Sequence, residues 1–257
     1  MNDKVPPGLQ RLWEPAARDA REPRLGLSLE RVVVAAIELA DADGLGAVSM
    51  SRVAQRLGFT TMSLYRYVKS KDELLLLMHD TAWQPPATLD DVLVEGWRPA
   101  LEHWCREMRA AMQRHPWLEQ IRVGDRLGTP SQLAWLDRGL RALRDTGLPE
   151  HEKSLVLLLL NGHVFADARM LADMMDAARS SGIPLEVTAG GYGEMLRVLA
   201  VPERFPDLHR AVESGSFDPD QIGRQSDPEV VFSFGLDRIL DGVERLVSQR
   251  RSDSSRC

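Results

Sequence analysis

A purely basic segment lies in the N-terminal third of the sequence. Between Gly44 and Lys71 there is no acidic residue, and the cations there are Arg52, Arg56, Arg66, Lys69 and Lys71. The 257-residue chain has a formal net charge of -6, so subtracting these five leaves -11 for the rest. A basic island on an acidic body indicates a surface that binds a polyanion. The alternative is a solvated helix face without a ligand, which describes most runs of charge.

Glycines divide this region into short helices. Ser28 is a good N-cap for a first helix, which Gly44 ends. Ser49 caps a second helix of about two turns, and Gly58 closes it. Glycine adopts positive φ at little steric cost, as a sharp turn between two helices requires. The pattern therefore predicts two helices joined to a third by a glycine turn.

The third helix is expected to begin at Thr60 or Thr61 and to end by Lys69. Leu64 and Val68 lie four residues apart and face the core, whereas Met62 and Arg66 point the opposite way. The outer face is therefore basic, polar and aromatic. This is the helix-turn-helix arrangement, in which the second helix of the pair enters the major groove. The expected partner of the basic segment is double-stranded DNA.

The rest of the chain has a helical period and no convincing strand pattern, so an all-α fold is expected. Ser70 and Glu73 form an S-x-x-E capping box that starts a fourth helix. Prolines without a sustained period suggest a flexible N-terminal arm, which we expect not to contact DNA. The expected organisation is an arm, a helix-turn-helix DNA-binding domain, a helical effector-binding and dimerisation domain, and a disordered tail, at residues 1–27, 28–72, 73–249 and 250–257.

The sequence from Val33 to Met78, "VVAAIELADADGLGAVSMSRVAQRLGFTTMSLYRYVKSKDELLLLM", resembles the tetracycline-repressor (TetR) family of bacterial transcriptional regulators. Its most specific part is Leu64-Tyr65-x-Tyr67-Val68-x-x-Lys71-Asp72. Beyond it, "RHPWLEQI" and "LAWLDRGLRALRDTGL" look like the C-terminal domain of that family, with less specificity. The resemblance implies an all-α homodimer whose small N-terminal domain reads DNA and whose larger C-terminal domain binds a small effector and dimerises.

Carried over by position, the resemblance implies DNA contacts. An arginine such as Arg66 can bond guanine O6 and N7 together, worth about 1–3 kcal/mol, and Met62 is suited to a thymine methyl. Tyr67 stands where many relatives have histidine. Tyr65 could instead serve packing, and the lysines could only position the protein. The implied DNA-binding residues are Ser49, Ser51, Arg52, Thr60, Thr61, Met62, Ser63, Tyr65, Arg66, Tyr67, Lys69 and Lys71.

The second part of the chain is rich in tryptophan, although aromatic residues make up only 6% of the sequence. Ligand pockets are mostly apolar with a few placed polar groups, and indoles can stack on a planar ligand. For any single tryptophan, core packing is the alternative. The predicted effector-binding residues are Trp104, Met108, Met112, Trp117, Trp135, Asn161, His163, Phe165, Asp167 and Met170.

His163 and Asp167 lie four residues apart on a long helix, so both are on one face. They could anchor a metal or a polar ligand, or they could form a structural hydrogen-bonded pair, the reading we favour. Two residues do not make a metal site. No metal, cofactor or catalytic residue is therefore predicted.

Small residues in the apolar stripes of the long helix and the final helix permit close helix approach; they are Gly162, Ala166, Gly235 and Gly242. The TetR family uses two such helices from each subunit as a four-helix dimer interface. A twofold dimer places its recognition helices about 34–36 Å apart and implies a palindromic operator.

The longest purely apolar runs, at 74–78 and 155–160, are far shorter than the roughly 18 residues of a membrane span. With no apolar secretion signal and only two cysteines, a cytoplasmic protein without a membrane partner is expected.

The function expected is a repressor released by a small, apolar or aromatic effector. The alternatives are an effector-independent nucleoid factor or an all-helical enzyme, for which no nucleophile motif, phosphate loop or metal-spaced cluster is present.

Overall fold

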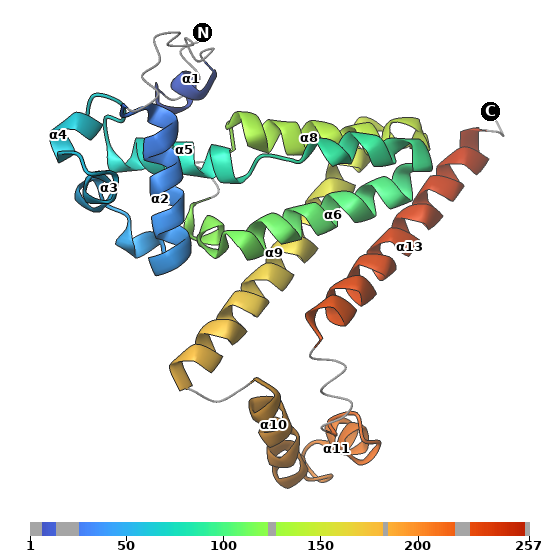
Figure 1. The fold of residues 1–257 in the computed structure, drawn as a ribbon. Helices are drawn as coiled ribbons and strands as arrows, with labels where there is room; N and C mark the ends of the chain where they lie inside the picture. Colours follow the sequence, from blue (N-terminus) through green and yellow to red (C-terminus); the bar gives the residue numbers. More distant parts are fainter. Residues whose placement is uncertain (1–6, 14–25, 123–126, 182–184, 219–226, 255–257) are drawn as a thin grey trace. The chain divides into compact units, whose positions relative to one another are not determined.

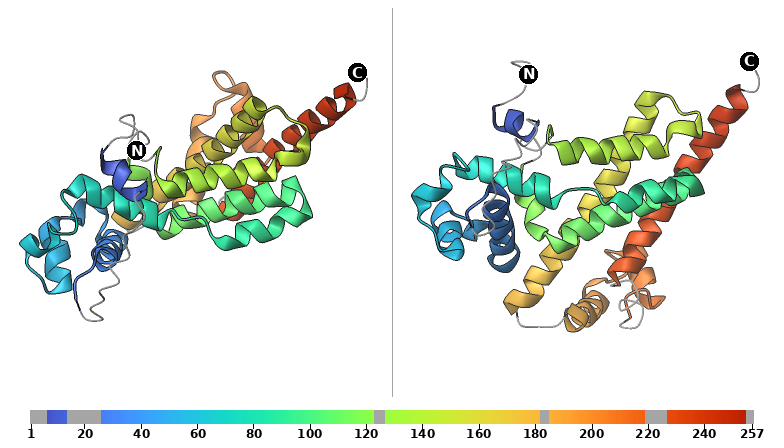
Figure 2. Two further views of the ribbon diagram at one scale, coloured as in Figure 1. Left: turned by 90° about the horizontal axis from the view of Figure 1, so that it is seen from above. Right: turned by 45° about the horizontal axis from the view of Figure 1, so that its top comes forward.

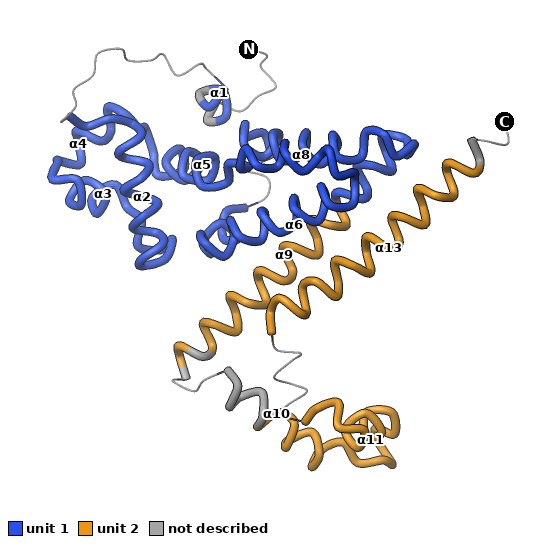
Figure 3. Tube along the Cα trace, turned by 45° about the vertical axis from the view of Figure 1, so that its right-hand side comes forward, with its two compact units in different colours: residues 1–157 blue, residues 158–257 orange. Residues whose placement is uncertain are grey.

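The computed structural model describes residues 7–13, 26–122, 127–181, 185–218 and 227–254. All regular elements in these ranges are helices, and none of the described residues forms a strand (Figure 1). The all-α fold expected from the periodicity is therefore confirmed. The chain divides into two compact units, residues 1–157 and residues 158–257, which are described separately (Figure 3).

The first unit begins its main helical body with four helices: α2 (Leu29–Asp43), α3 (Met50–Leu57), α4 (Thr61–Leu64) and α5 (Lys71–Ala82). A short 3-10 helix, η1 (Leu45–Ala47), connects α2 to α3. The apolar stripes predicted from the sequence meet in one core. Its fully buried side chains include Ala36, Val53, Leu64, Val68 and Leu74.

The helix α4 is shorter than expected. We predicted a helix that ends by Lys69, but regular α-helix stops at Leu64. The N–H groups of Tyr67 and Val68 both donate to the Leu64 carbonyl, at 2.8 and 3.0 Å. Because two donors converge on one carbonyl, the helical ladder closes into a turn. Arg66 therefore lies on the turn that follows α4.

The start of α5 follows the predicted capping box with one difference. Ser70 Oγ accepts the Glu73 N–H at 3.1 Å, as expected. The Glu73 carboxylate, however, accepts the N–H of Lys69 at 2.6 Å, one residue before the N-cap. The two bonds still hold the turn after α4 against the first turn of α5.

The remainder of the first unit follows α5 in the sequence. It consists of η2 (Ala87–Glu95), α6 (Trp97–Arg114), η3 (Pro116–Gln120), α8 (Pro130–Ala142) and η4 (Arg144–Thr146), followed by the first turns of α9 (Glu150–Ser181). Helices α6 and α8 lie side by side (Figures 1 and 2). The predicted N-cap of α8 is confirmed, since Thr129 Oγ1 accepts the Gln132 N–H at 3.4 Å.

Part of the expected flexible arm is helical. Helix α1 (Pro7–Trp13) packs against α5, and the side chain of Leu9 is buried. The Trp13 indole N–H donates to the Gly128 carbonyl at 2.8 Å. A Cβ at Gly128 would lie 2.8 Å from Leu9 Cδ1, so glycine at this position permits Leu9 to pack closely against the backbone. Residues 14–25, the rest of the arm after α1 up to Gly26, are outside the described residues.

The second unit contains most of α9, together with α10 (Leu185–Leu199), α11 (Pro206–Glu213) and α13 (Pro228–Ser254). Helices α10 and α11 enclose a small core of Leu196, Ala200 and Val212. Helix α13 continues to Ser254, so the described part of the expected tail is helical. The division at residue 157 separates two compact units and does not mark a functional domain boundary. The domain limits expected from the sequence therefore stay a prediction.

Helix α9 is unusually apolar. By length and composition alone, its Glu150–Ala177 segment could cross a membrane. Core helices of soluble proteins meet the same criterion, so a single such helix is weak evidence. The sequence-based expectation of no membrane partner is not tested by it.

Candidate nucleic-acid interface

Gly58 makes the turn between α3 and α4, as predicted. Its φ of 75° and ψ of 26° lie in the left-handed region, where a side chain would be strained. The Gly58 N–H donates to the Gln55 carbonyl at 3.1 Å, and the Phe59 N–H donates to the Ala54 carbonyl at 2.9 Å. These bonds satisfy the last carbonyls of α3 and fix the direction in which α4 leaves.

The side chains around α4 divide between core and solvent as the sequence predicts. Leu64 and Val68 are fully buried, whereas Met62 is 76% exposed and Tyr65 is 45% exposed. Arg66 is also exposed. An exposed methionine of this size has no packing role in the first unit. The α4 region therefore presents one apolar, one aromatic and one cationic side chain together to solvent.

The five cations of the basic segment have different surroundings. Arg52 pairs with Asp43 at 2.8 Å, and Arg56 pairs with Glu38 at 2.9 Å. Among the described residues, no carboxylate lies within 4.0 Å of the side-chain nitrogens of Arg66, Lys69 or Lys71. The unpaired cations therefore lie on the turn after α4 (Arg66 and Lys69) and at the start of α5 (Lys71), where a phosphate backbone is expected.

Several hydroxyls predicted to contact DNA already serve as helix caps. Ser49 Oγ accepts the Arg52 N–H at 3.2 Å. Thr60 Oγ1 accepts the Ser63 N–H at 3.3 Å and lies 2.9 Å from Ser63 Oγ. The remaining predicted DNA residues Ser51 and Lys69 are exposed, and Thr61 and Tyr67 are partly exposed. DNA contact by each of these residues stays a prediction.

Three tryptophans of the first unit form a hydrogen-bonded group in its core. Trp83, Trp104 and Trp135 are at most 2% exposed. The Trp135 indole N–H donates to the Trp83 carbonyl at 2.7 Å, and the Trp104 indole N–H donates to the Trp135 carbonyl at 2.9 Å. Met108 and Met112 are also buried. The packing alternative therefore describes these side chains, and an additional role in effector binding stays a prediction.

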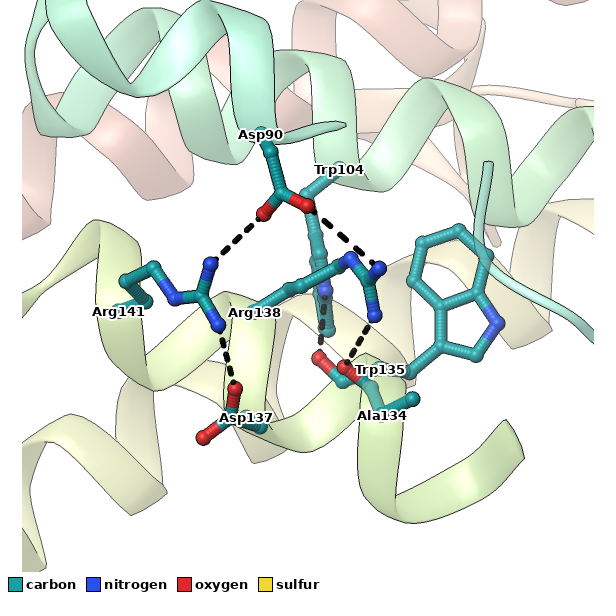
Figure 4. Close-up of polar contacts among 7 residues, drawn as sticks. All are labelled: Asp90, Trp104, Ala134, Trp135, Asp137, Arg138 and Arg141. Carbon is teal, nitrogen blue, oxygen red and sulfur yellow. Dashed lines mark hydrogen bonds and ion pairs between the residues drawn. The ribbon is translucent and has the colours of Figure 1, made fainter. Parts of the chain in front are cut away.

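An ion-pair network on the surface near these tryptophans joins η2 to α8 (Figure 4). Asp90 lies 2.9 Å from an Arg141 nitrogen and 3.6 Å from an Arg138 nitrogen, and Arg141 also contacts Asp137 at 3.0 Å. Arg138 donates to the Ala134 carbonyl at 3.5 Å. Such partly exposed pairs contribute little stability each, so their main effect is to orient η2.

Two contacts that the sequence analysis missed connect the DNA-binding helices to the helices that follow. Asp80, on α5, accepts the Ser131 N–H at the start of α8 at 2.8 Å. Asp41, on α2, accepts from His115 Nδ1 at 2.8 Å and from the buried Trp117 indole N–H at 2.6 Å. Each pair is separated by more than 50 residues, so no local sequence pattern indicates it.

His163, in the second unit, packs between two helices. Its Nε2–H donates to the Phe232 carbonyl of α13 at 2.9 Å, and its ring stacks on the Phe232 ring with centroids 5.1 Å apart. A Cβ at Gly235 would lie 2.4 Å from His163 Cε1. Glycine at this position therefore permits the close approach of α9 and α13, and a ligand-binding role for His163 stays a prediction.

The other predicted effector residues of the second unit are less defined. Asp167 is buried, Asn161 and Phe165 are partly buried, and Met170 is 49% exposed. Among the described residues, no group of three His, Cys, Asp or Glu side chains could hold a metal ion. Effector binding by these residues is not tested by their geometry.

Two family models match the chain. Residues 32–78 match the model described as "Bacterial regulatory proteins, tetR family", and residues 93–247 match "Tetracyclin repressor-like, C-terminal domain". The second match alone spans more than half of the sequence. The chain therefore belongs to the tetracycline-repressor (TetR) family of bacterial transcriptional regulators, and it is not an enzyme. This confirms the resemblance drawn from Val33 to Met78.

Individual relatives agree with this assignment. The HTH-type transcriptional repressor DrrR1 of Streptomyces coeruleorubidus is 38% identical over 247 residues, which cover 96% of this chain and 88% of DrrR1. Among solved structures, apo ActR of Streptomyces coelicolor matches with a TM-score of 0.67 at 26% identity, over 90% of this chain and 99% of ActR. ActR in complex with actinorhodin matches with a TM-score of 0.66 at 26% identity, over 84% and 94% of the two chains.

Proposed function

We propose that this protein is a repressor that binds a palindromic operator as a homodimer and is released by a small apolar or aromatic effector. The observation that carries the DNA-binding part is the exposed cluster of Met62, Tyr65 and Arg66 beside the glycine turn. A guanidinium can read guanine, and a methionine can contact a thymine methyl. The lysines that follow supply contacts to phosphate, in the cytoplasm where the DNA is.

The exposed face of α9 supports the homodimer. Leu155, Leu158 and Leu159 are 60%, 68% and 54% exposed, and the stripe continues through Gly162 and Ala166. These positions follow the i, i+3, i+4, i+7 spacing of one helix face. A large apolar face rimmed by polar residues marks an association surface. The small residues at its centre permit a second helix to approach closely.

The effector is argued from relatives and from residue type. One solved relative, ActR, is recorded in complex with actinorhodin. In this chain the helix α6 carries Trp104, Met108 and Met112 along one buried side. Methionine adapts its shape readily and an indole offers a flat face, so displacement of this packing by a planar ligand is chemically reasonable.

Release from DNA requires only a modest coupling. An effector that binds better to one conformer shifts the population toward it, and typical couplings are about 1–3 kcal/mol. If that conformer holds the two recognition helices away from a spacing of about 34–36 Å, they no longer fit successive major grooves. Repression then ends without any unfolding.

The test is selection of bound sequences from a random duplex pool by the purified full-length protein. Enrichment of a palindrome supports a dimeric, sequence-specific regulator, and genomic copies of that palindrome identify the regulated genes and suggest effectors. Absence of enrichment at moderate salt contradicts the operator proposal and favours an effector-independent nucleoid factor.

A further inference from the structure

The carboxylate of Asp41 lies at a junction between helices that are distant in sequence. Asp41 belongs to the last turn of α2, and its Oδ1 accepts from His115 Nδ1 at 2.8 Å and from Trp117 Nε1 at 2.6 Å. These donors are 74 and 76 residues away. One oxygen therefore joins the first helix of the DNA-binding part to η3 at the end of α6.

An acid at this position needs such partners. The last turn of a helix carries partial negative charge, so a carboxylate there is unfavourable. Asp43, two residues later, is balanced by Arg52 within the same three-helix group. Among the described residues, the side-chain hydrogen bonds to the Asp41 carboxylate come only from across the junction, from His115 and Trp117. Conversely, Trp117 is 2% exposed, and a buried indole N–H without an acceptor would be costly.

The chain around the two donors makes their positions depend on α6. His115 ends α6, with its N–H on the Ala111 carbonyl at 3.0 Å. Pro116 then starts η3, and the rings of His115 and Trp117 lie with centroids 5.8 Å apart. Because no flexible segment separates them from the helix, a shift of the C-terminal half of α6 moves both donors. That half carries Met108 and Met112.

We propose that Asp41 is a positioning residue that couples the state of α6 to the orientation of the DNA-binding helices. The inference rests on the proposed function, in which effector and operator prefer different conformers. Coupling between two sites is reciprocal, so operator binding must also alter the α6–η3 end through the same contact. The effector need not be known to detect it.

The experiment is hydrogen exchange of the full-length protein, with and without a duplex enriched from the random pool. In the wild type, the duplex is expected to change exchange of the amides at 117–121. In Asp41→Ala, this change is expected to fall at least about fivefold, the lower end of common couplings. Asp43→Ala removes a neighbouring acid whose ion pair is with Arg52 of α3, and it should keep the wild-type response.

A second variant protects the test against a simple folding failure. Trp117→Phe removes one donor and leaves no buried N–H without an acceptor, and it should also reduce the response at 118–121. An unchanged response in both junction variants overturns the proposal, as does a wild type that binds the duplex without any change at η3. Failure of the proposed function is different, because no duplex would then be enriched for the wild type.

Discussion

Arginines on either side of the glycine turn have different electrostatic surroundings. Arg52 and Arg56 are held by acids of α2, at 2.8 and 2.9 Å. Arg66 is exposed, and among the described residues it forms no ion pair. A guanidinium that is already paired must give up its partner to bind a base or a phosphate. At the residue scale, Arg66 is therefore the arginine of the three that can contact a base without first breaking an ion pair to a described residue.

Arg66→Ala is expected to abolish specific operator binding and to leave dimerisation intact. Loss of a bidentate contact to guanine costs about 1–3 kcal/mol, and specificity should relax at that base pair. A gel-shift titration on the selected duplex measures the affinity, and sedimentation measures the dimer. Arg210→Ala removes one surface charge from α11, where Arg210 pairs with Asp207, and serves as the control. Equal affinities for the two variants would contradict the recognition assignment.

Cys105 provides a second prediction at this scale. Burial on α6 raises the pKa of its thiol well above the usual range. The folded protein therefore keeps the proton when the unfolded chain loses it, above about pH 8.5, and stability falls as pH rises beyond that value. Chemical denaturation between pH 7 and 10 should show the decrease, and Cys105→Ala should reduce it. A slope unaffected by the substitution would contradict the assignment to Cys105.

At the scale of elements, a chain of indole hydrogen bonds sets the packing of α5, α6 and α8. Trp104 bonds α6 to α8, and Trp135 bonds α8 to the C-terminus of α5. Their rings also contact edge to face, with centroids 6.1 Å apart. The Trp83 carbonyl lies at the C-terminal end of α5, where helical carbonyls lack an intrahelical donor, and the Trp135 N–H satisfies it. These bonds fix the helix that connects the DNA-binding part to the rest of the first unit.

Trp135→Phe tests this chain. The substitution keeps an aromatic ring but removes the donor to the Trp83 carbonyl, so the free energy of unfolding should fall by about 1–3 kcal/mol. Trp97→Phe, at a half-buried position at the start of α6, should cost about 0.5 kcal/mol or less. Urea denaturation measures both. A cost for Trp135→Phe no larger than that for Trp97→Phe would show that the bond contributes little.

At the scale of the whole molecule, the apolar face of α9 is exposed to solvent in a single chain. Leu158 is 68% exposed, and Phe234 of α13 is 65% exposed. Burying one such side chain fully is worth about 1.5–3 kcal/mol. Several of them on one face supply a strong driving force for association with a second copy.

Leu158→Glu is expected to convert the protein to a monomer that does not bind the palindrome, because a charge would be buried without a partner in the interface. The monomer should fold, since the side chain is exposed within one chain. Sedimentation and gel shift measure the two effects. Leu133→Glu, at a 40% exposed position of α8, is the matched control and should remain dimeric. A dimeric, DNA-binding Leu158→Glu protein would place the interface elsewhere.

The sequence by itself determined the features that depend on neighbouring residues. The side chains of Ser49 and Thr129 cap helices by accepting from backbone N–H groups three residues ahead. Gly58 makes a turn because it has no side chain to strain the left-handed backbone. The inward position of Leu64 and the outward position of Met62 follow from helical spacing. These local rules were sufficient to predict the helix-turn-helix and the all-α fold. The length of α4 was overestimated, because residue spacing does not show where two backbone N–H groups share one carbonyl.

Only the tertiary structure decided which distant groups meet. Asp41 is an ordinary surface acid in the sequence, and its acceptor role depends on the turn that brings Trp117 beside it. The packing of His163 against α13 likewise depends on Phe232, 69 residues away. Hydrogen bonds act over about 3 Å of space whatever the separation along the chain. Their partners are therefore fixed by how the helices pack.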